Sequence, residues 1–167
     1  GVARFLQRAW RMLVDEDAAG EPARALSAGA GTQEQARLVA TTIQGVTEDL
    51  EAMRFNTAIA KLMVFVRDVA KDAPIARDAA EAFVRLLAPL APHAAEELWE
   101  KLGHSTSITT APWPQWSAEH LVEDSFSYPI SFNGKTRLQL EFPIALDAKS
   151  VEEQVLANPE VQARLEG

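Results

Sequence analysis

Apolar residues recur every three or four positions through most of the first hundred residues, and this helical period limits the possible folds more than any other feature. Five such stretches are predicted helices: 2–14, 32–51, 56–72, 74–87 and 92–102. Hydrophobic residues make up 47% of the 167-residue chain, which is enough to bury a core. We therefore predict a mainly α fold that opens with an antiparallel helix bundle.

Capping residues set the expected limits of these helices. Thr32 with Gln35 matches a capping box, Asn56 is a favourable N-cap, and Pro74 suits a first helical turn. A short helical turn is predicted at 22–26, within a loop rich in glycine and acidic residues. The spacing of the third helix predicts a buried side formed by Phe55, Ile59, Leu62, Met63 and Val66.

Beyond residue 103 the pattern changes from helical spacing to prolines and then to strict alternation. Apolar residues alternate with polar ones on both sides of Asn133–Gly134, which is a strong signal for a β-hairpin. Ser150 and Glu153 match a capping box for a helix over 151–157, and a further helical piece is expected near 159–165.

Two strands are marginal by themselves in water, so the hairpin and its helix are predicted to be a small, incomplete α+β unit. The expected domains are a helical domain over 1–115, a linker over 116–125, and a truncated C-terminal α/β domain over 126–167.

Charge and composition exclude several classes of protein. The chain has no cysteine, which removes disulfides, thiolate metal sites and cysteine nucleophiles. No run approaches the roughly 18 apolar residues of a membrane span, so we expect a soluble, cytoplasmic protein without a membrane partner. The net charge of -8 argues against a polyanionic partner, yet residues 86–130 alone hold six acids against one lysine. Net charge therefore decides little.

Three arginines give the first predicted helix a basic face. Arg4, Arg8 and Arg11 are spaced by four and then three residues and are the only charged residues among the first 14. Such a face fits contact with phosphates, although a helix surface that merely faces water has the same spacing. Two further basic pairs are weaker candidates: Arg54 with Lys61 across the start of the third helix, and Lys135 with Arg137 after the hairpin turn.

Signatures of catalysis are missing. The glycines at 29 and 31 lack the lysine of a phosphate-binding loop. His93 and Glu96 have the spacing of some metal sites, but Glu97 stands where the second histidine is needed, so no metal site is predicted.

Several stretches, taken in order, resemble the C-terminal part of bacterial-type leucyl-tRNA synthetases, which are class I enzymes. They are RFLQRAW at 4–10, VTEDL at 46–50, FNTAI at 55–59, LAPLAPH at 87–93, EELW at 96–99, APWP at 111–114, VED at 122–124, and NGK at 133–135 with Arg137. Gly45 departs from the family pattern, which often has a longer and frequently basic side chain there.

The resemblance implies an anticodon-binding helix bundle, followed by the start of a small domain that helps hold the outer corner of the tRNA. The partners would be leucine-accepting tRNA and the catalytic domain of the same polypeptide, which uses ATP and Mg. The HIGH and KMSKS signatures of that catalytic domain are absent, so this chain would be the tRNA-binding portion of a leucine-tRNA ligase without the reaction centre. Arg4 and Arg8 match the family's arginines and would contact backbone phosphates, with Arg11 beside them.

Other functions remain open at this point. The proline-histidine and Glu-Leu-Trp stretches also resemble valyl- and isoleucyl-tRNA synthetases. The acidic middle and the tryptophan-rich linker would equally suit a helical protein-interaction module with no RNA role. An autonomous hydrolase would need His93 and Glu96 to converge in one cleft.

Overall fold

The structure is a computed structural model of the 167-residue chain, and it describes residues 1–20, 23–69, 71, 74–121, 125–132, 135–143 and 146–165. Within these ranges the side chains of 120, 125–127, 132, 135–137, 141, 143 and 163–165 are not described. The chain forms two compact units, Gly1–Leu121 and Val122–Gly167. The predicted domain limits at 115 and 126 stay a prediction.

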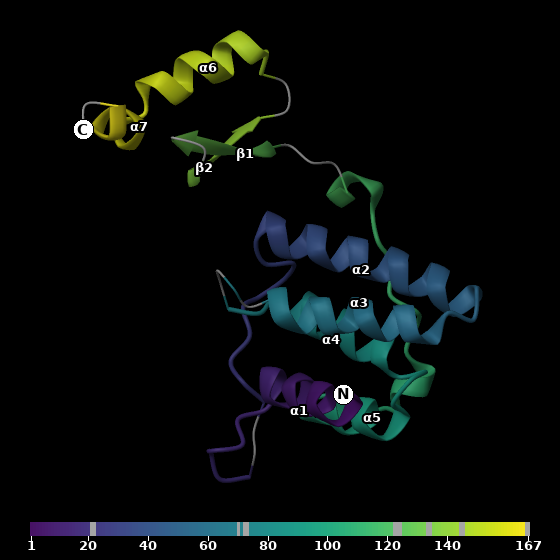
Figure 1. The fold of residues 1–167 in the computed structure, drawn as a ribbon. Coiled ribbons are helices and arrows are strands. Elements are labelled where there is room, and N and C mark those ends of the chain that lie inside the picture. Colours follow the sequence, from purple (N-terminus) through teal and green to yellow (C-terminus); the bar gives the residue numbers. More distant parts are fainter. Residues whose placement is uncertain are drawn as a thin grey trace. The chain divides into compact units, whose positions relative to one another are not determined.

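The first unit is a helix bundle. Its helices are α1 (Val2–Leu13), α2 (Gln33–Glu51), α3 (Phe55–Asp68), α4 (Arg77–Leu87) and α5 (Pro92–Lys101), followed by the short 3-10 helices η1 (Ile108–Thr110) and η2 (Ala118–Leu121). Helices α3 and α4 lie between α2 on one side and α1 with α5 on the other (Figure 1). The predicted mainly α fold is confirmed.

The core fills the space between these helices. Phe65 of α3 and Phe83 of α4 stack with ring centroids 5.3 Å apart, and both are at most 1% exposed. Leu13, Ile43 and Leu98 bring α1, α2 and α5 to the same core. Burial of such side chains is worth roughly 1.5–3 kcal/mol each, so the bundle has its own source of stability.

Helix α2 begins at its predicted cap, whereas α4 begins later than predicted. Thr32 Oγ1 accepts a hydrogen bond from the Gln35 backbone N–H at 3.1 Å, as a capping box requires. The buried Gln35 amide then bonds the Pro74 carbonyl at 3.0 Å and the Ala76 N–H at 2.9 Å. These bonds hold the segment before α4 in an extended path, so the prediction that Pro74 lies in the first turn is wrong, and α4 begins at Arg77.

Helix α3 also begins before its predicted cap. Arg54 is the N-cap, and its carbonyl accepts from both Thr57 and Ala58, so Asn56 lies inside the helix. The buried side of α3 is Ala58, Leu62 and Phe65. Phe55 is 44% exposed and Met63 is 37% exposed, which corrects their assignment to the core. The buried face of α3 is therefore rotated from the face that the spacing of apolar residues predicts.

Residues 23–26, in the loop after α1, form no helical turn. The Arg24 N–H donates to the Leu13 carbonyl at 2.7 Å, beside an antiparallel bridge between Val14 and Ala23. The short helical turn predicted at 22–26 therefore does not form in residues 23–26, because their backbone groups bond to the end of α1.

The second unit contains a hairpin and two helices. Strands β1 (Ser125–Phe132) and β2 (Lys135–Pro143) pair antiparallel, and α6 (Ala148–Ala157) and α7 (Pro159–Leu165) follow. The predicted hairpin is confirmed, while its Asn133–Gly134 turn lies outside the described residues.

The cap of α6 is Asp147, not Ser150. The Asp147 carboxylate accepts from the Ser150 N–H at 3.1 Å, and hydrogen bonds from Ser150 lower the pKa of this carboxyl below its ordinary value. Asp147 is as good a cap as serine, and the helix therefore begins two residues earlier than Ser150. No helix in the described ranges has the length and apolar character needed to cross a membrane.

Candidate nucleic-acid interface

Helix α1 separates apolar and basic side chains onto opposite faces. Phe5, Ala9 and Leu13 are buried in the core. Arg4 and Arg8 are exposed, and neither makes an ion pair or side-chain hydrogen bond with any residue that the structure describes. Their guanidinium groups therefore keep all their donors for a ligand.

Arg11 lies on the same face but is engaged. Its Nε donates to Glu16 Oε2 at 2.7 Å, and this hydrogen bond, together with the charge of Glu16, raises the pKa of Arg11 above its ordinary value. The Arg11 carbonyl accepts from Arg24 Nε at 2.8 Å. The basic face of α1 thus has two free cations and a third that is partly neutralised.

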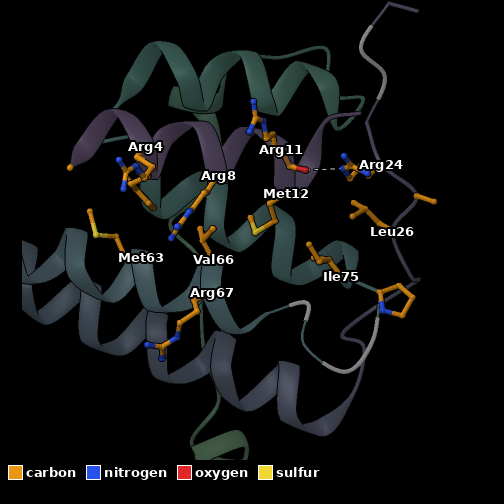
Figure 2. A pocket seen from close by; sticks show the side chains of 14 residues that line it. Arg4, Arg8, Arg11, Met12, Arg24, Leu26, Met63, Val66, Arg67 and Ile75 are labelled. Atoms are coloured by element: carbon orange, nitrogen blue, oxygen red, sulfur yellow. Dashed lines mark hydrogen bonds between the residues drawn. The ribbon is translucent and has the colours of Figure 1, made fainter. Parts of the chain in front are cut away.

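A groove of about 840 Å³ runs between α1, α3 and the segments that contain residues 24–26 and 74–75. Five arginines line it: Arg4, Arg8, Arg11, Arg24 and Arg67. None of the described residues that line the groove is acidic. Figure 2 shows Arg4 and Arg8 projecting from α1 toward Met63, Val66 and Arg67 on α3. In a chain with a net charge of -8, this groove is a local concentration of positive charge.

The arginines at the edges of the groove are held by carboxylates that lie outside its lining. Arg67 donates to both oxygens of Asp68, at 2.8 and 2.7 Å, and Lys71 lies 2.7 Å from the same carboxylate. These two cations lower the pKa of Asp68 well below its usual range. Arg24 Nη2 lies 3.9 Å from Asp15, a loose contact at the limit of an ion pair. Each of these arginines keeps further N–H donors for a ligand.

The weaker sequence candidates on α3 share one buried carboxylate. Arg54 Nε donates to Asp49 Oδ1 at 2.9 Å, and Lys61 Nζ lies 2.7 Å from Asp49 Oδ2. The Asp49 side chain is 2% exposed, and the hydrogen bond from Lys61, helped by the one from Arg54, lowers the pKa of its carboxyl. Lys61 Nζ also donates to the Gly45 carbonyl at 2.8 Å.

Gly45 lets Lys61 take this path. A Cβ at position 45 would lie 3.0 Å from Cδ, Cε and Nζ of Lys61, tighter than ordinary van der Waals contact. Lys61 of the neighbouring helix thus occupies the space that a side chain at position 45 would need.

The structure describes the remaining candidate residues in less detail. Lys135 and Arg137 lie on β2, and their side chains are outside the described part of the chain. Glu96 Oε2 accepts from the Ile108 N–H at 3.1 Å and from the Ser107 hydroxyl at 3.2 Å, so it is bonded to the start of η1. His93 is exposed. Among the described residues no group of three or more His, Asp or Glu side chains could hold a metal ion.

Two arginines of the groove were not identified from the sequence. Arg24 lies in a loop and Arg67 near the end of α3, and neither shares a helical face with Arg4 or Arg8 in the sequence. Only the packing of α1 against α3 and the loop brings them together.

Comparisons with known proteins bear on this site. The family model for the anticodon-binding domain of tRNA ligase matches residues 36–153. The leucine–tRNA ligase of Cytophaga hutchinsonii is 43% identical over 167 residues, which cover 100% of this chain and 18% of that protein. That of Rhodopirellula baltica is 45% identical over 165 residues, covering 97% of this chain and 17% of that protein.

A solved structure shares the fold. It is the ternary complex of Agrobacterium radiobacter K84 agnB2 LeuRS with tRNA and LeuAMS, with a TM-score of 0.58, 28% identity, and coverage of 98% of this chain and 21% of that one. The resemblance to leucyl-tRNA synthetases is thereby confirmed, and the chain spans about a fifth of the length of these relatives. Because the family model covers residues 36–153, most of its length, the chain belongs to the anticodon-binding domain family of tRNA ligases.

Proposed function

We propose that this chain is the tRNA-binding portion of a leucine–tRNA ligase. The whole ligase would act in the cytoplasm and join leucine to its tRNA, with ATP and Mg bound by a catalytic domain that is not part of this sequence. Within that enzyme the chain would hold the tRNA while the distant reaction centre acts on its acceptor end.

The arginine-lined groove is the single observation that carries this proposal. Nucleic-acid backbones bind basic surfaces because bound counterions are released, and this term dominates affinity. The groove gathers five arginines from three segments although the chain as a whole is acidic. The solved relative that covers 98% of the chain is a complex with tRNA, which agrees with this reading.

The proposed contacts are ranked by what faces each cation. Arg4 and Arg8 contact backbone phosphates, and Arg11 supports them through the donors that Glu16 leaves free. Arg54 and Lys61 contribute less, because Asp49 neutralises one of their two charges. Lys135 and Arg137 of β2 would meet the outer corner of the tRNA, as the resemblance implies. Phosphate contacts of this kind position the RNA without reading its bases.

A salt titration tests the proposal. Binding of leucine-accepting tRNA is measured by fluorescence anisotropy at several salt concentrations, for the wild type and for Arg4→Ala/Arg8→Ala. We expect the log–log slope to decrease by about 0.7–0.9 for each phosphate that the variant no longer neutralises. The control is Lys101→Ala/Lys149→Ala, which removes the same charge outside the groove and leaves the slope near the wild-type value. An unchanged slope in the arginine variant would remove the groove from the function.

A protein-docking function has one observation in its favour. Met53 is 71% exposed and Phe55 is 44% exposed at the turn between α2 and α3, as a docking surface would need. The same titration separates the two functions, because a module that docks protein has no salt-dependent affinity for tRNA. Comparison with valine- and isoleucine-accepting tRNA separates the leucyl assignment from the related synthetases.

A further inference from the structure

The groove is lined by more than arginines. Its floor is formed by apolar side chains from α1, α3 and two loops, namely Phe5, Met12, Leu26, Met63, Val66 and Ile75. Its volume of about 840 Å³ lies in the range of sites that enclose a small molecule. A surface used only to attract phosphates does not need an apolar floor.

A continuous RNA duplex would use this groove poorly. In a duplex the bases are stacked inside, and the outer surface consists of phosphates and riboses. Pressing a phosphate onto an apolar floor removes its water without replacing it, which is unfavourable. A duplex would therefore touch only the arginines at the rim and leave the floor without a partner.

The apolar faces of an unstacked base match the apolar floor of the groove. Its ring faces are apolar and its phosphate stays at the chain backbone, so one nucleotide presents both chemistries side by side. In Figure 2 Met63 of α3 lies beside Arg4, whereas Met12 of α1 lies farther along the groove, beyond Arg8 and Val66. Met63 is 37% exposed. Methionine is unbranched and polarisable and makes favourable contacts with aromatic rings.

We infer that the groove holds a single unstacked nucleotide of the bound RNA, with its phosphate at Arg4 and Arg8 and its base against Met63 and Val66 of α3. This inference rests on the proposed function and adds to it the kind of RNA element that the groove takes. Arg11, Arg24 and Arg67 also line the groove, and each is anchored through its own Nε, so they add positive charge near the bound phosphate.

Methionine methyl NMR tests the inference directly. The chain has three methionines, and the third, Met53, is 71% exposed and does not line the groove. The chain labelled with ¹³C at the methionine methyls is titrated with an RNA duplex that carries one bulged nucleotide and with the same duplex without the bulge. We expect a ring-current shift of the Met63 methyl, and a smaller one of the Met12 methyl, with the bulged RNA only, while the Met53 methyl stays in place.

Affinities give a second readout. Base stacking predicts that the bulged duplex binds roughly five- to a hundredfold more tightly than the perfect duplex. Met63→Ser should reduce this ratio, Met63→Leu should largely retain it, and Met53→Ser serves as the matched control. Met63 is partly exposed, so these variants are expected to fold, which urea unfolding verifies.

The outcomes separate this inference from the proposed function. Equal affinity for both duplexes, or a bound RNA that leaves the Met12 and Met63 methyls unshifted, would overturn the inference while tRNA binding stands. Absence of salt-dependent RNA binding would overturn both. Displacement of the bulged RNA by AMP at micromolar concentration would show that the groove binds a free nucleotide. It would overturn the inference that the groove holds a nucleotide of an RNA chain.

Discussion

Two pairs of cations in the helix bundle differ in what faces them. Arg4 and Arg8 on α1 border a groove without an acidic lining residue among those described, and neither has an ion-pair partner in that part of the chain. Arg54, the N-cap of α3, and Lys61, in the middle of α3, converge on Asp49, whose side chain is 2% exposed. The first pair is available to a ligand, whereas the second fixes α3 to α2.

The difference shows that spacing along a helix identifies basic side chains but not their availability. Arg54 and Lys61 are seven residues apart, a spacing that predicts the same side of a helix, much as the spacing of Arg4 and Arg8 does. What separates the pairs is one carboxylate on another helix. Asp49 has the additional effect of holding both cations in place, because a buried carboxylate needs partners.

The largest difference is expected from the same charge reversal in both regions. We expect Arg8→Glu to weaken tRNA binding by about tenfold or more at 0.1 M salt, since one phosphate contact is worth roughly that factor. Arg54→Glu changes the net charge equally and should weaken binding much less. Anisotropy titrations of the two variants under identical conditions measure the ratio.

Equal weakening of tRNA binding by Arg8→Glu and Arg54→Glu would contradict the distinction between the two pairs. The affinity would then follow overall charge and not the groove. Urea unfolding of both variants is needed beside the titrations, because Arg54→Glu also places a second acid next to Asp49 and is expected to destabilise the bundle.

Lys61→Met is expected to affect stability more than RNA binding. It keeps the apolar stem and removes the ammonium group 2.7 Å from Asp49 Oδ2, so the buried carboxylate retains Arg54 alone. We predict a lower urea midpoint at pH 7. Lys101→Met, at the end of α5, is the control and should shift the midpoint less.

The pH dependence of this destabilisation follows from the lowered pKa of Asp49. A carboxyl whose pKa is lower when folded stabilises the fold fully above its unfolded pKa of about 3.9, and loses this contribution as the pH falls through the folded value. Lys61→Met reduces the shift, so the gap between wild type and variant should close as the pH falls below about 4. A gap independent of pH would show that Lys61 acts through packing.

Much of the fold could be predicted from local signals. The apolar period found five helices, and the alternation around residues 133–134 found the hairpin. The errors lie where a distant group decides the boundary, or where a neighbouring residue caps equally well. Pro74 is excluded from α4 because Gln35, on another helix, bonds the backbone before Arg77. Asp147 caps α6 three residues before Ser150, the predicted cap.

Less of the candidate site than of the fold could be predicted from the sequence. The face with Arg4 and Arg8 follows from helical spacing alone, but Glu16 beside Arg11 and Asp49 beside Arg54 are contacts that depend on tertiary structure. The groove itself requires α1, α3 and two loops to meet. The exposure of Met63 could not be foreseen, because an apolar residue at that spacing is usually buried.

Gly45→Ala gives the smallest expected effect and the finest test of the Asp49 cluster. Alanine in a helix interior is favoured over glycine by roughly 0.5–1 kcal/mol. The new Cβ would lie 3.0 Å from the end of the flexible Lys61 side chain, which must move away from the Gly45 carbonyl. These effects oppose each other, so the net change in unfolding free energy should stay within about 1 kcal/mol. The Asp49 pKa, followed by NMR, should rise, because Lys61 is its leading partner; a pKa that stays in place while stability increases would mean that Lys61 reaches Asp49 without the space that glycine leaves.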